Sequence, residues 1–273
     1  MNTILSVWSQ YFFEFSPEDA VDEFIKNGYR ACELSDEHGR LLLERSFDVK
    51  KTGADFAAFL NDRNFSIPQG HLWLKIKICT DPESIDELFR WIDLYEAIGI
   101  RNMVLHCDTS FPDDVGREER IERNAVALRQ VAEYVKGRDI VICLENLRST
   151  IFPRNASDLL TVIEKIGSEN FGICLDTGHL NLTEKDQRAF ILAADDKLRA
   201  LHIADNQGET DQHMMPFGKG TVDFCEVVRA LREVDYDGLF NLEIPGESRI
   251  PLELRAAKLR YIQSCYDYLM RIE

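Results

Sequence analysis

The sequence predicts a closed (β/α)8 TIM barrel, an α/β fold formed as a single domain by residues 1–273. Eight short apolar runs alternate with eight longer segments in which apolar residues recur at helical spacing. No shift in composition divides the chain, and its 273 residues fit the roughly 250 that such a barrel needs. Alternation of this kind favours one parallel sheet buried on both faces, and eight strands are enough to close it.

Each predicted strand is a run of six to eight mostly apolar residues, and each predicted helix is a longer amphipathic segment. The strands cover residues 3–8, 30–35, 65–71, 102–107, 140–146, 171–176, 198–205 and 238–244. The helices cover residues 16–28, 48–64, 81–99, 116–137, 155–167, 184–196, 222–234 and 252–269. Many of the helical segments open with Ser, Asp or Asn, which cap helix N-termini, and several end on Gly or Asn.

Composition argues against several classes of protein. The formal net charge of −16 repels polyphosphates and anionic membranes at long range, so we expect neither nucleic acid nor a membrane as a partner. The apolar runs are too short to cross a bilayer, which takes about 20 residues. Met1 leads into the first strand without a signal-peptide pattern, and the seven cysteines include no CxxC pair. These features predict a cytoplasmic protein with reduced thiols, and they leave open whether it forms a homo-oligomer.

Ionisable side chains stand at the carboxyl ends of most predicted strands. They are His71, His106, Glu145, Asp176, His202 and Glu243, with His179 just after the sixth strand and Asp211 and His213 in the loop after the seventh. The strand ends of a closed barrel surround one axis, so these groups should converge at the mouth, where the active sites of such barrels lie. Three converging carboxylates would repel one another without a cation, and carboxylate and imidazole are ordinary ligands of divalent metals. The sequence therefore predicts a metal site.

Four stretches of the chain resemble a known family. They are "ICLENL", "ICLDTGHL", "ALHIADNQGETDQHMMPFGKGTVDF" and "LFNLEI". They resemble the xylose-isomerase-like barrels of the sugar phosphate isomerase/epimerase superfamily, a group that also contains the zinc enzyme endonuclease IV. The resemblance covers essentially the whole chain. It implies one central divalent metal, Mn or Zn with Mg or Co as alternatives, bound by Glu145, Asp176, His202 and Glu243.

The resemblance also implies roles for individual residues. In the epimerases of the group the two glutamates transfer the proton, which makes Glu145 and Glu243 the expected catalytic pair. His179 matches a histidine that binds substrate or an additional metal. A further four residues match positions that complete a three-zinc cluster in the endonuclease, namely His71, His106, Asp211 and His213. We therefore expect these five residues to bind substrate or additional metal.

We expect an isomerase or epimerase whose partner is a small sugar or sugar phosphate. A metal would polarise the carbonyl, a carboxylate would remove the neighbouring proton, and the metal would stabilise the resulting enediolate. Trp8 is expected either to stack on a sugar face or to pack at the barrel top, and Arg148 could bind a phosphate. Glu33, at the end of the second strand, could accept a sugar hydroxyl or simply face solvent.

Three alternatives remain beside the isomerase. One is a zinc-dependent endonuclease that cuts at abasic sites, and another is a sugar or inosose dehydratase on the same site. The third is a non-catalytic metal-binding subunit. The bulky "ENLRST" loop, Gly178 where the endonucleases carry Cys, and the acidic balance all favour a small-molecule substrate over DNA.

Overall fold

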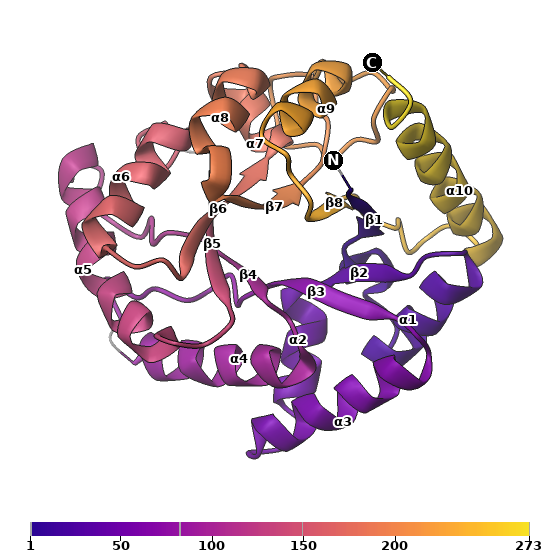
Figure 1. Ribbon diagram of the computed structural model, residues 1–273, viewed down its shortest axis with the longest axis horizontal. Coiled ribbons are helices and arrows are strands. Elements are labelled where there is room, and N and C mark those ends of the chain that lie inside the picture. Colours follow the sequence, from indigo (N-terminus) through magenta and orange to yellow (C-terminus); the bar gives the residue numbers. More distant parts are fainter. Residues whose placement is uncertain (1, 82, 149, 273) are drawn as a thin grey trace.

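The structure is a computed structural model that describes residues 2–81, 83–148 and 150–272. Eight parallel strands form a central ring, and helices surround it (Figure 1). The strands are β1 (Ile4–Val7), β2 (Ala31–Leu34), β3 (Ser66–His71), β4 (Asn102–Leu105), β5 (Val141–Glu145), β6 (Phe171–Asp176), β7 (Leu198–His202) and β8 (Leu239–Leu242). Each lies within a segment that the sequence predicts as a strand, so the (β/α)8 barrel is confirmed.

The ring consists of two sheets joined at two seams. Strands β2 to β7 pair in sequence order, and β1 pairs with β8, all in parallel. One seam is closed by a parallel bridge between Trp8 and Glu33, and the other by a bridge between Ile203 and Leu242. Backbone hydrogen bonds support the second seam: Ile203 N donates to Asn241 O at 2.7 Å, and Glu243 N donates to Ile203 O at 3.0 Å.

The eight expected helices are all present in the outer layer. They are α1 (Pro17–Lys26), α3 (Val49–Asp62), α4 (Ser84–Ile98), α5 (Arg117–Val135), α6 (Ala156–Ile166), α8 (Gln187–Ala194), α9 (Phe224–Glu233) and α10 (Leu252–Leu269). Among the described residues, none of these helices is long and apolar enough to cross a membrane. Their buried apolar residues belong to one large hydrophobic core, which also includes residues of the strands.

Two short helices, α2 (Asp36–Leu43) and α7 (Thr177–Thr183), were not expected from the sequence. Each follows the end of a strand at once and is capped by the residue at that junction. The side chain of Ser35 accepts from His38 N at 3.4 Å, and the side chain of Asp176 accepts from His179 N at 2.7 Å. The cap of α7 places His179 beside the end of β6, which matters for the site.

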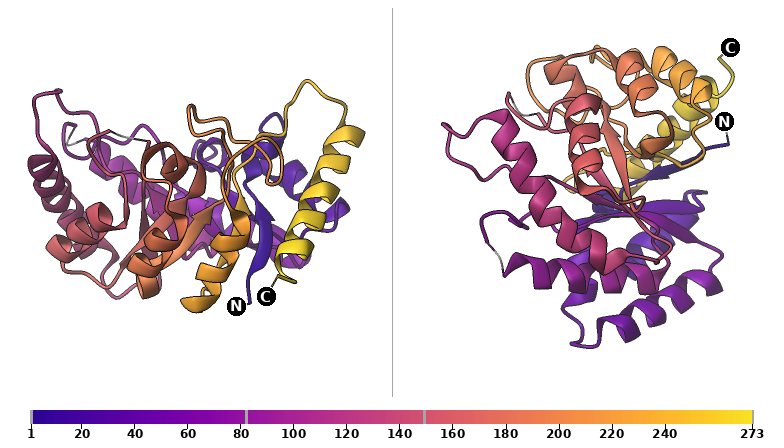
Figure 2. Two further views of the ribbon diagram at one scale, coloured as in Figure 1. Left: turned by 90° about the horizontal axis from the view of Figure 1, so that it is seen from above. Right: turned by 60° about the vertical axis from the view of Figure 1, so that its left-hand side comes forward.

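Small side chains fill the inside of the ring below its mouth. Val104, Cys143, Cys174 and Ala200 come from β4, β5, β6 and β7 and form a fully buried cluster. All seven cysteines are free thiols. The long loop after β7 rises over one end of the barrel, opposite the end where both chain termini lie (Figure 2, left). The fold therefore leaves the carboxyl ends of the strands as the place for a site.

Candidate metal centre at the barrel mouth

Four ionisable side chains meet at the carboxyl ends of β5 to β8. Glu145, Asp176 and His202 are the last residues of their strands, and Glu243 follows β8 directly. Each offers a ligand atom that lies within 4.8 Å of a ligand atom of every other member, and all four residues are buried. We call these four residues the central cluster. They are the set that the family resemblance assigns to one divalent metal.

The central cluster contains three buried atoms without a hydrogen-bond partner. These atoms are Asp176 Oδ2, His202 Nδ1 and Glu243 Oε2. A buried polar atom left unpaired costs about 1–3 kcal/mol, so three of them in one place require an explanation. The other polar atoms of Asp176 and His202 are engaged, with His179 N and with the Glu33 carboxylate. These ligand atoms therefore fit a metal cation, which all three unpaired atoms would bind.

Four of the site histidines are oriented by an acceptor behind the ring. His71 Nδ1 donates to Leu72 O at 2.7 Å, His179 Nδ1 to Asn146 O at 3.0 Å, His213 Nδ1 to Glu243 O at 2.9 Å, and His202 Nε2 to Glu33 Oε1 at 3.0 Å. A carbonyl or carboxylate only accepts, so the ring nitrogen that faces it carries the hydrogen. In the neutral ring, the other nitrogen then presents its lone pair to the site, as metal-binding histidines do.

Two further groups flank the central cluster. On one side, Nε2 of His71 and Nε2 of His106 lie 3.4 and 3.2 Å from Glu145 Oε2. These two histidines and Glu145 also have ligand atoms within 4.8 Å of one another. On the other side, Nε2 of His179 and Nε2 of His213 each lie 3.3 Å from an oxygen of Asp211. The structure thus brings the four histidines assigned to substrate or additional metal against the central cluster, and Asp211 reaches the cluster through His179 and His213.

Without a metal, protons balance the charge of these carboxylates. Burial raises the pKa of Glu243 to about 8, and the charges of Asp176 and Glu145 add to this against the opposing effect of His202. Burial alone would lower the pKa of His71, but the hydrogen bond and charge of Glu145 outweigh it and raise the pKa to about 9. The groups at this site therefore hold protons at neutral pH that a cation would replace.

A cavity of about 550 Å³ opens onto the centre. Its wall includes Trp8, Leu74, Leu147 and Arg148. The Trp8 ring stacks on the His213 ring, with 6.2 Å between centroids and 3° between planes. The Arg148 side chain is 65% exposed, and its Nη1 lies 3.7 Å from Asp211 Oδ2. Both residues expected to contact substrate therefore line this cavity.

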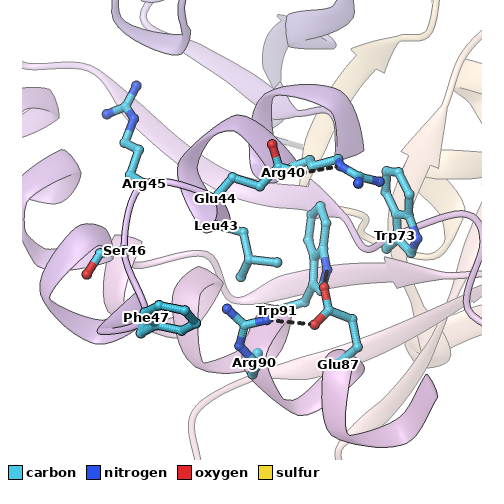
Figure 3. A pocket seen from close by; sticks show the side chains of 10 residues that line it. All are labelled: Arg40, Leu43, Glu44, Arg45, Ser46, Phe47, Trp73, Glu87, Arg90 and Trp91. Carbon is cyan, nitrogen blue, oxygen red and sulfur yellow. Dashed lines mark hydrogen bonds and ion pairs between the residues drawn. The ribbon is translucent and has the colours of Figure 1, made fainter. Parts of the chain in front are cut away.

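A second hollow, of about 510 Å³, lies outside the barrel mouth beside α2 and α4 (Figure 3). Two of its arginines are paired within the wall, since Arg40 Nε donates to Glu44 at 2.6 Å and Arg90 donates to Glu87 at 2.8 Å. Its third arginine, Arg45, pairs with Glu18 outside the wall. The Arg40 guanidinium also lies over the Trp73 ring, 4.4 Å from its centroid. Among the described residues, no group of clustered metal ligands includes a residue of this wall. The barrel mouth is therefore the candidate site.

The structure places Glu33 neither at a substrate nor in solvent. Its side chain is fully buried, with 0% exposure, and it accepts from His202 Nε2 at 3.0 Å. Both expectations for this residue, a contact with a sugar hydroxyl and a solvated strand end, are wrong because the side chain points into the ring below the mouth. The signal in the sequence is an acid inside the run "RACELS", but its partner stands 169 positions later.

Fold and site together define a parallel (β/α)8 barrel protein with a candidate metal centre at the carboxyl ends of its strands. The chain belongs to the xylose isomerase-like TIM barrel family, whose model matches residues 21–265. The family resemblance seen in the sequence is therefore confirmed.

Similar proteins include enzymes of two kinds. An L-ribulose 3-epimerase of Methylomonas sp. (strain DH-1) is 30% identical over 60% of this chain and 58% of that protein. A probable endonuclease 4 of Ureaplasma parvum is 26% identical over 71% of each chain. A crystal structure of D-psicose 3-epimerase from Clostridium cellulolyticum H10 with D-tagatose superposes with a TM-score of 0.80 at 14% identity, covering 98% of this chain and 99% of that chain. At this identity the superposition shows the fold alone, and the chain spans less than two thirds of the epimerase that it matches in sequence.

Proposed function

We propose that this protein is a sugar epimerase or isomerase that uses a divalent metal, Mn²⁺ or Zn²⁺, in the central cluster. The observation that carries the proposal is the set of three unpaired ligand atoms, buried beneath an open cavity. Three carboxylates and one imidazole suit either ion, and Mg²⁺ or Co²⁺ are alternatives. The similarity to an L-ribulose 3-epimerase supports a ketose as the substrate class.

A divalent cation, when bound, supplies Lewis acidity that acidifies the C–H next to a ketose carbonyl. Glu145 and Glu243 are the proposed proton-transfer pair. Glu243 lines the cavity and is 7% exposed there, so a substrate carbon can approach its carboxylate. Removal of the proton on one face and its return on the other inverts the carbon, which is epimerisation. Return to the neighbouring carbon is isomerisation.

The cavity wall favours an uncharged sugar over a sugar phosphate. Arg148 is the one permanent cation among the described residues that line it, and this side chain is mostly exposed and lies near Asp211. A phosphate is normally bound by several donors, often with bidentate guanidinium contacts. Trp8, Leu74 and Leu147 offer apolar surface that suits the C–H faces of a sugar ring or chain.

Deuterium exchange tests the proposed proton transfer. The metal-loaded protein is incubated with each of a panel of free ketoses in heavy water, and NMR follows the hydrogen next to the carbonyl. The wild type should exchange it, and Glu243→Gln should lose exchange, because the amide keeps the shape of the side chain but cannot act as a base.

The matched control is Glu247→Gln, since Glu247 is an exposed residue four positions further on that pairs with Lys258 at 2.9 Å. This variant should exchange as the wild type does. Full activity in both Glu145→Gln and Glu243→Gln would remove these residues from the chemistry. Turnover without solvent exchange would instead indicate a hydride shift within the substrate. Appearance of a dehydrated product would indicate the dehydratase.

A metal-dependent endonuclease is the second candidate, and the two flanking groups favour it. His71 and His106 on one side and His179, Asp211 and His213 on the other could bind two more cations. The similarity to a probable endonuclease 4 supports the same alternative. Two features argue against an endonuclease. The net charge of −16 repels DNA, and the bulky Leu147 and Arg148 line the cavity.

Two measurements separate the candidates. Elemental analysis of the purified protein should give one metal per chain if the flanking residues bind substrate, and up to three if they bind metal. A duplex with one abasic site, incubated with the zinc-loaded protein, should remain uncut. Multiple-turnover cleavage of that duplex would reverse the order of the two functions.

A further inference from the structure

Four polar side chains from four strands form a buried chain of hydrogen bonds inside the ring. They are Ser6 on β1, Glu33 on β2, His202 on β7 and Asn241 on β8, and each has 0% exposure. Ser6 Oγ donates to Asn241 Oδ1 at 2.7 Å, and Asn241 Nδ2 donates to Glu33 Oε2. Glu33 Oε1 accepts from His202 Nε2 at 3.0 Å. The chain ends at the nitrogen opposite, His202 Nδ1, which has no hydrogen-bond partner.

Each bond fixes the direction of the next. The carboxylate of Glu33 can only accept, so the amide of Asn241 must turn its NH2 toward Glu33 and its oxygen toward Ser6. For the same reason His202 must carry a hydrogen on Nε2. In the neutral ring, Nδ1 then bears the lone pair, and it lies 3.2 Å from Glu145 Oε2 and 3.5 Å from Glu243 Oε2. The buried chain thus turns the ligand nitrogen of His202 toward the central cluster.

Glu33 is also an unusual residue to bury for stability alone. Within the described residues, His202 is the one ion-pair partner recorded for it. A buried carboxylate loses its solvation, and one ring and one amide replace that solvation only in part. Burial of Glu33 becomes more favourable when His202 binds a cation. The carboxylate then makes the coordinating nitrogen of the imidazole a stronger ligand.

We propose that Glu33 is a positioning residue of the metal centre, which fixes the tautomer and orientation of His202 through Nε2 and is itself held by Asn241 and Ser6. The proposal rests on the assignment of His202 as a metal ligand in the proposed function. It does not depend on which reaction the centre performs. Glu33 would act without touching metal or substrate.

The test uses Zn²⁺ and three variants of the full chain. Glu33→Gln removes the charge behind His202. The new amide can keep its oxygen toward Nε2 only if the Asn241 amide turns over and donates to Ser6 Oγ; otherwise an N–H faces Nε2 and forces the hydrogen onto Nδ1. Zn²⁺ affinity, measured by competition with a chromophoric chelator, should fall about 10- to 100-fold, as for other partners of metal-bound histidines. Glu37→Gln is the matched control, since it makes the same substitution on the neighbouring helix α2, and it should leave affinity unchanged.

The double variant Glu33→Gln with Asn241→Asp keeps the chain's direction. The amide introduced by Glu33→Gln can donate to the new carboxylate while its oxygen accepts from His202, and Ser6 donates to the other carboxylate oxygen. Zn²⁺ affinity should recover by about tenfold relative to Glu33→Gln, a partial return within the loss expected for such partners. A mere loss of packing would not be rescued in this way. Equal affinities in the single and double variants would overturn the proposal.

A spectroscopic readout separates orientation from folding. In the Zn²⁺-loaded wild type with ¹⁵N-labelled histidine, the Nε2 hydrogen of His202 should be visible and slow to exchange, because Glu33 buries it. Glu33→Gln should shift this resonance or speed its exchange, and the double variant should restore it. If Glu33→Gln fails to fold, the double variant is compared with wild type instead. A Zn²⁺ affinity within about tenfold of wild type, together with a protected Nε2 hydrogen, supports the role of Glu33. An unprotected Nε2 hydrogen refutes it.

Failure of this inference and failure of the proposed function give different results. Wild type that binds Zn²⁺ through His202 but exchanges no ketose hydrogen leaves the role of Glu33 intact and removes the epimerase. Wild type that epimerises a ketose while Glu33→Gln keeps full Zn²⁺ affinity and the same Nε2 resonance leaves the function intact and removes Glu33.

Discussion

Asp176 performs two tasks with its two carboxylate oxygens, and one substitution separates them. Oδ1 caps α7 by accepting from His179 N at 2.7 Å, while Oδ2 is buried and unpaired in the central cluster. Asparagine caps helices as well as aspartate does. In Asp176→Asn the amide oxygen can therefore keep the cap, and an NH2 group that cannot bind a cation takes the place of Oδ2. The variant should fold and lose the metal.

The size of the effect follows from ligand linkage. A metal at a free concentration 100 times its Kd stabilises the folded wild type by about 2.7 kcal/mol. At about 2–4 °C per kcal/mol for chains of this size, Tm should rise by about 5–10 °C. If the variant weakens binding until Kd equals the metal concentration, linkage leaves about 0.4 kcal/mol and a shift near 1 °C. The metal-free variant should stay close to metal-free wild type, because removing the Asp176 charge relieves its repulsion of Glu243 but also removes its attraction for His179.

The assay is thermal unfolding with and without added Mn²⁺ or Zn²⁺, combined with elemental analysis. Asp186→Asn is the matched control, since Asp186 caps α8 by accepting from Ala189 N at 2.8 Å and lies at the surface. It should show the full metal-induced shift. A shift of wild-type size in Asp176→Asn, with unchanged metal content, would refute the assignment of Asp176 as a ligand.

Two further outcomes are expected. Metal affinity should rise with pH up to about 8, because Glu243 holds a proton up to about that pH and a cation bound by its carboxylate must displace it. Calorimetry in buffers of different ionisation enthalpy should detect the released proton, and a flat profile would contradict this. Gly220→Ala should destabilise the fold by about 1–3 kcal/mol in urea unfolding, because the added methyl would overlap the carboxylate of Asp205. Gly116→Ala, whose added methyl meets nothing within 4 Å, should cost less than the Gly220 change.

The sequence predicts the strands and the mouth well because both depend on local patterns. A run such as 171–176 is apolar throughout and ends on Asp176, so the strand and the position of its acid follow from the same six residues. The closed ring then places every strand end around one axis without any further information. This is why the central cluster, His71 and His106 could be predicted to converge before any distance was known.

What the sequence does not reveal depends on packing between distant segments. The helix α2 contains Gly39, a poor helix former, because a methyl group there would overlap Trp91 and the hydroxyl of Tyr95. The helix α7 is too short, at 7 residues, for its periodicity to be recognised. The role of Glu33 depends on His202, and only the closed ring brings these two residues together. Each case is a tertiary contact that overrides or completes the local pattern.

The joining of β1 to β8 has a consequence for how the protein is made. Glu243 follows β8 and is the last of the four central residues to leave the ribosome, and β8 pairs only after β1, made first, is available to receive it. A nascent chain that ends before residue 243 therefore carries three of the four proposed ligands and an open seam. Tight metal capture would then begin only when synthesis of the ring is nearly finished. Under the proposed function, the ion enters a barrel that is already closing, and an unfinished chain has little power to sequester it.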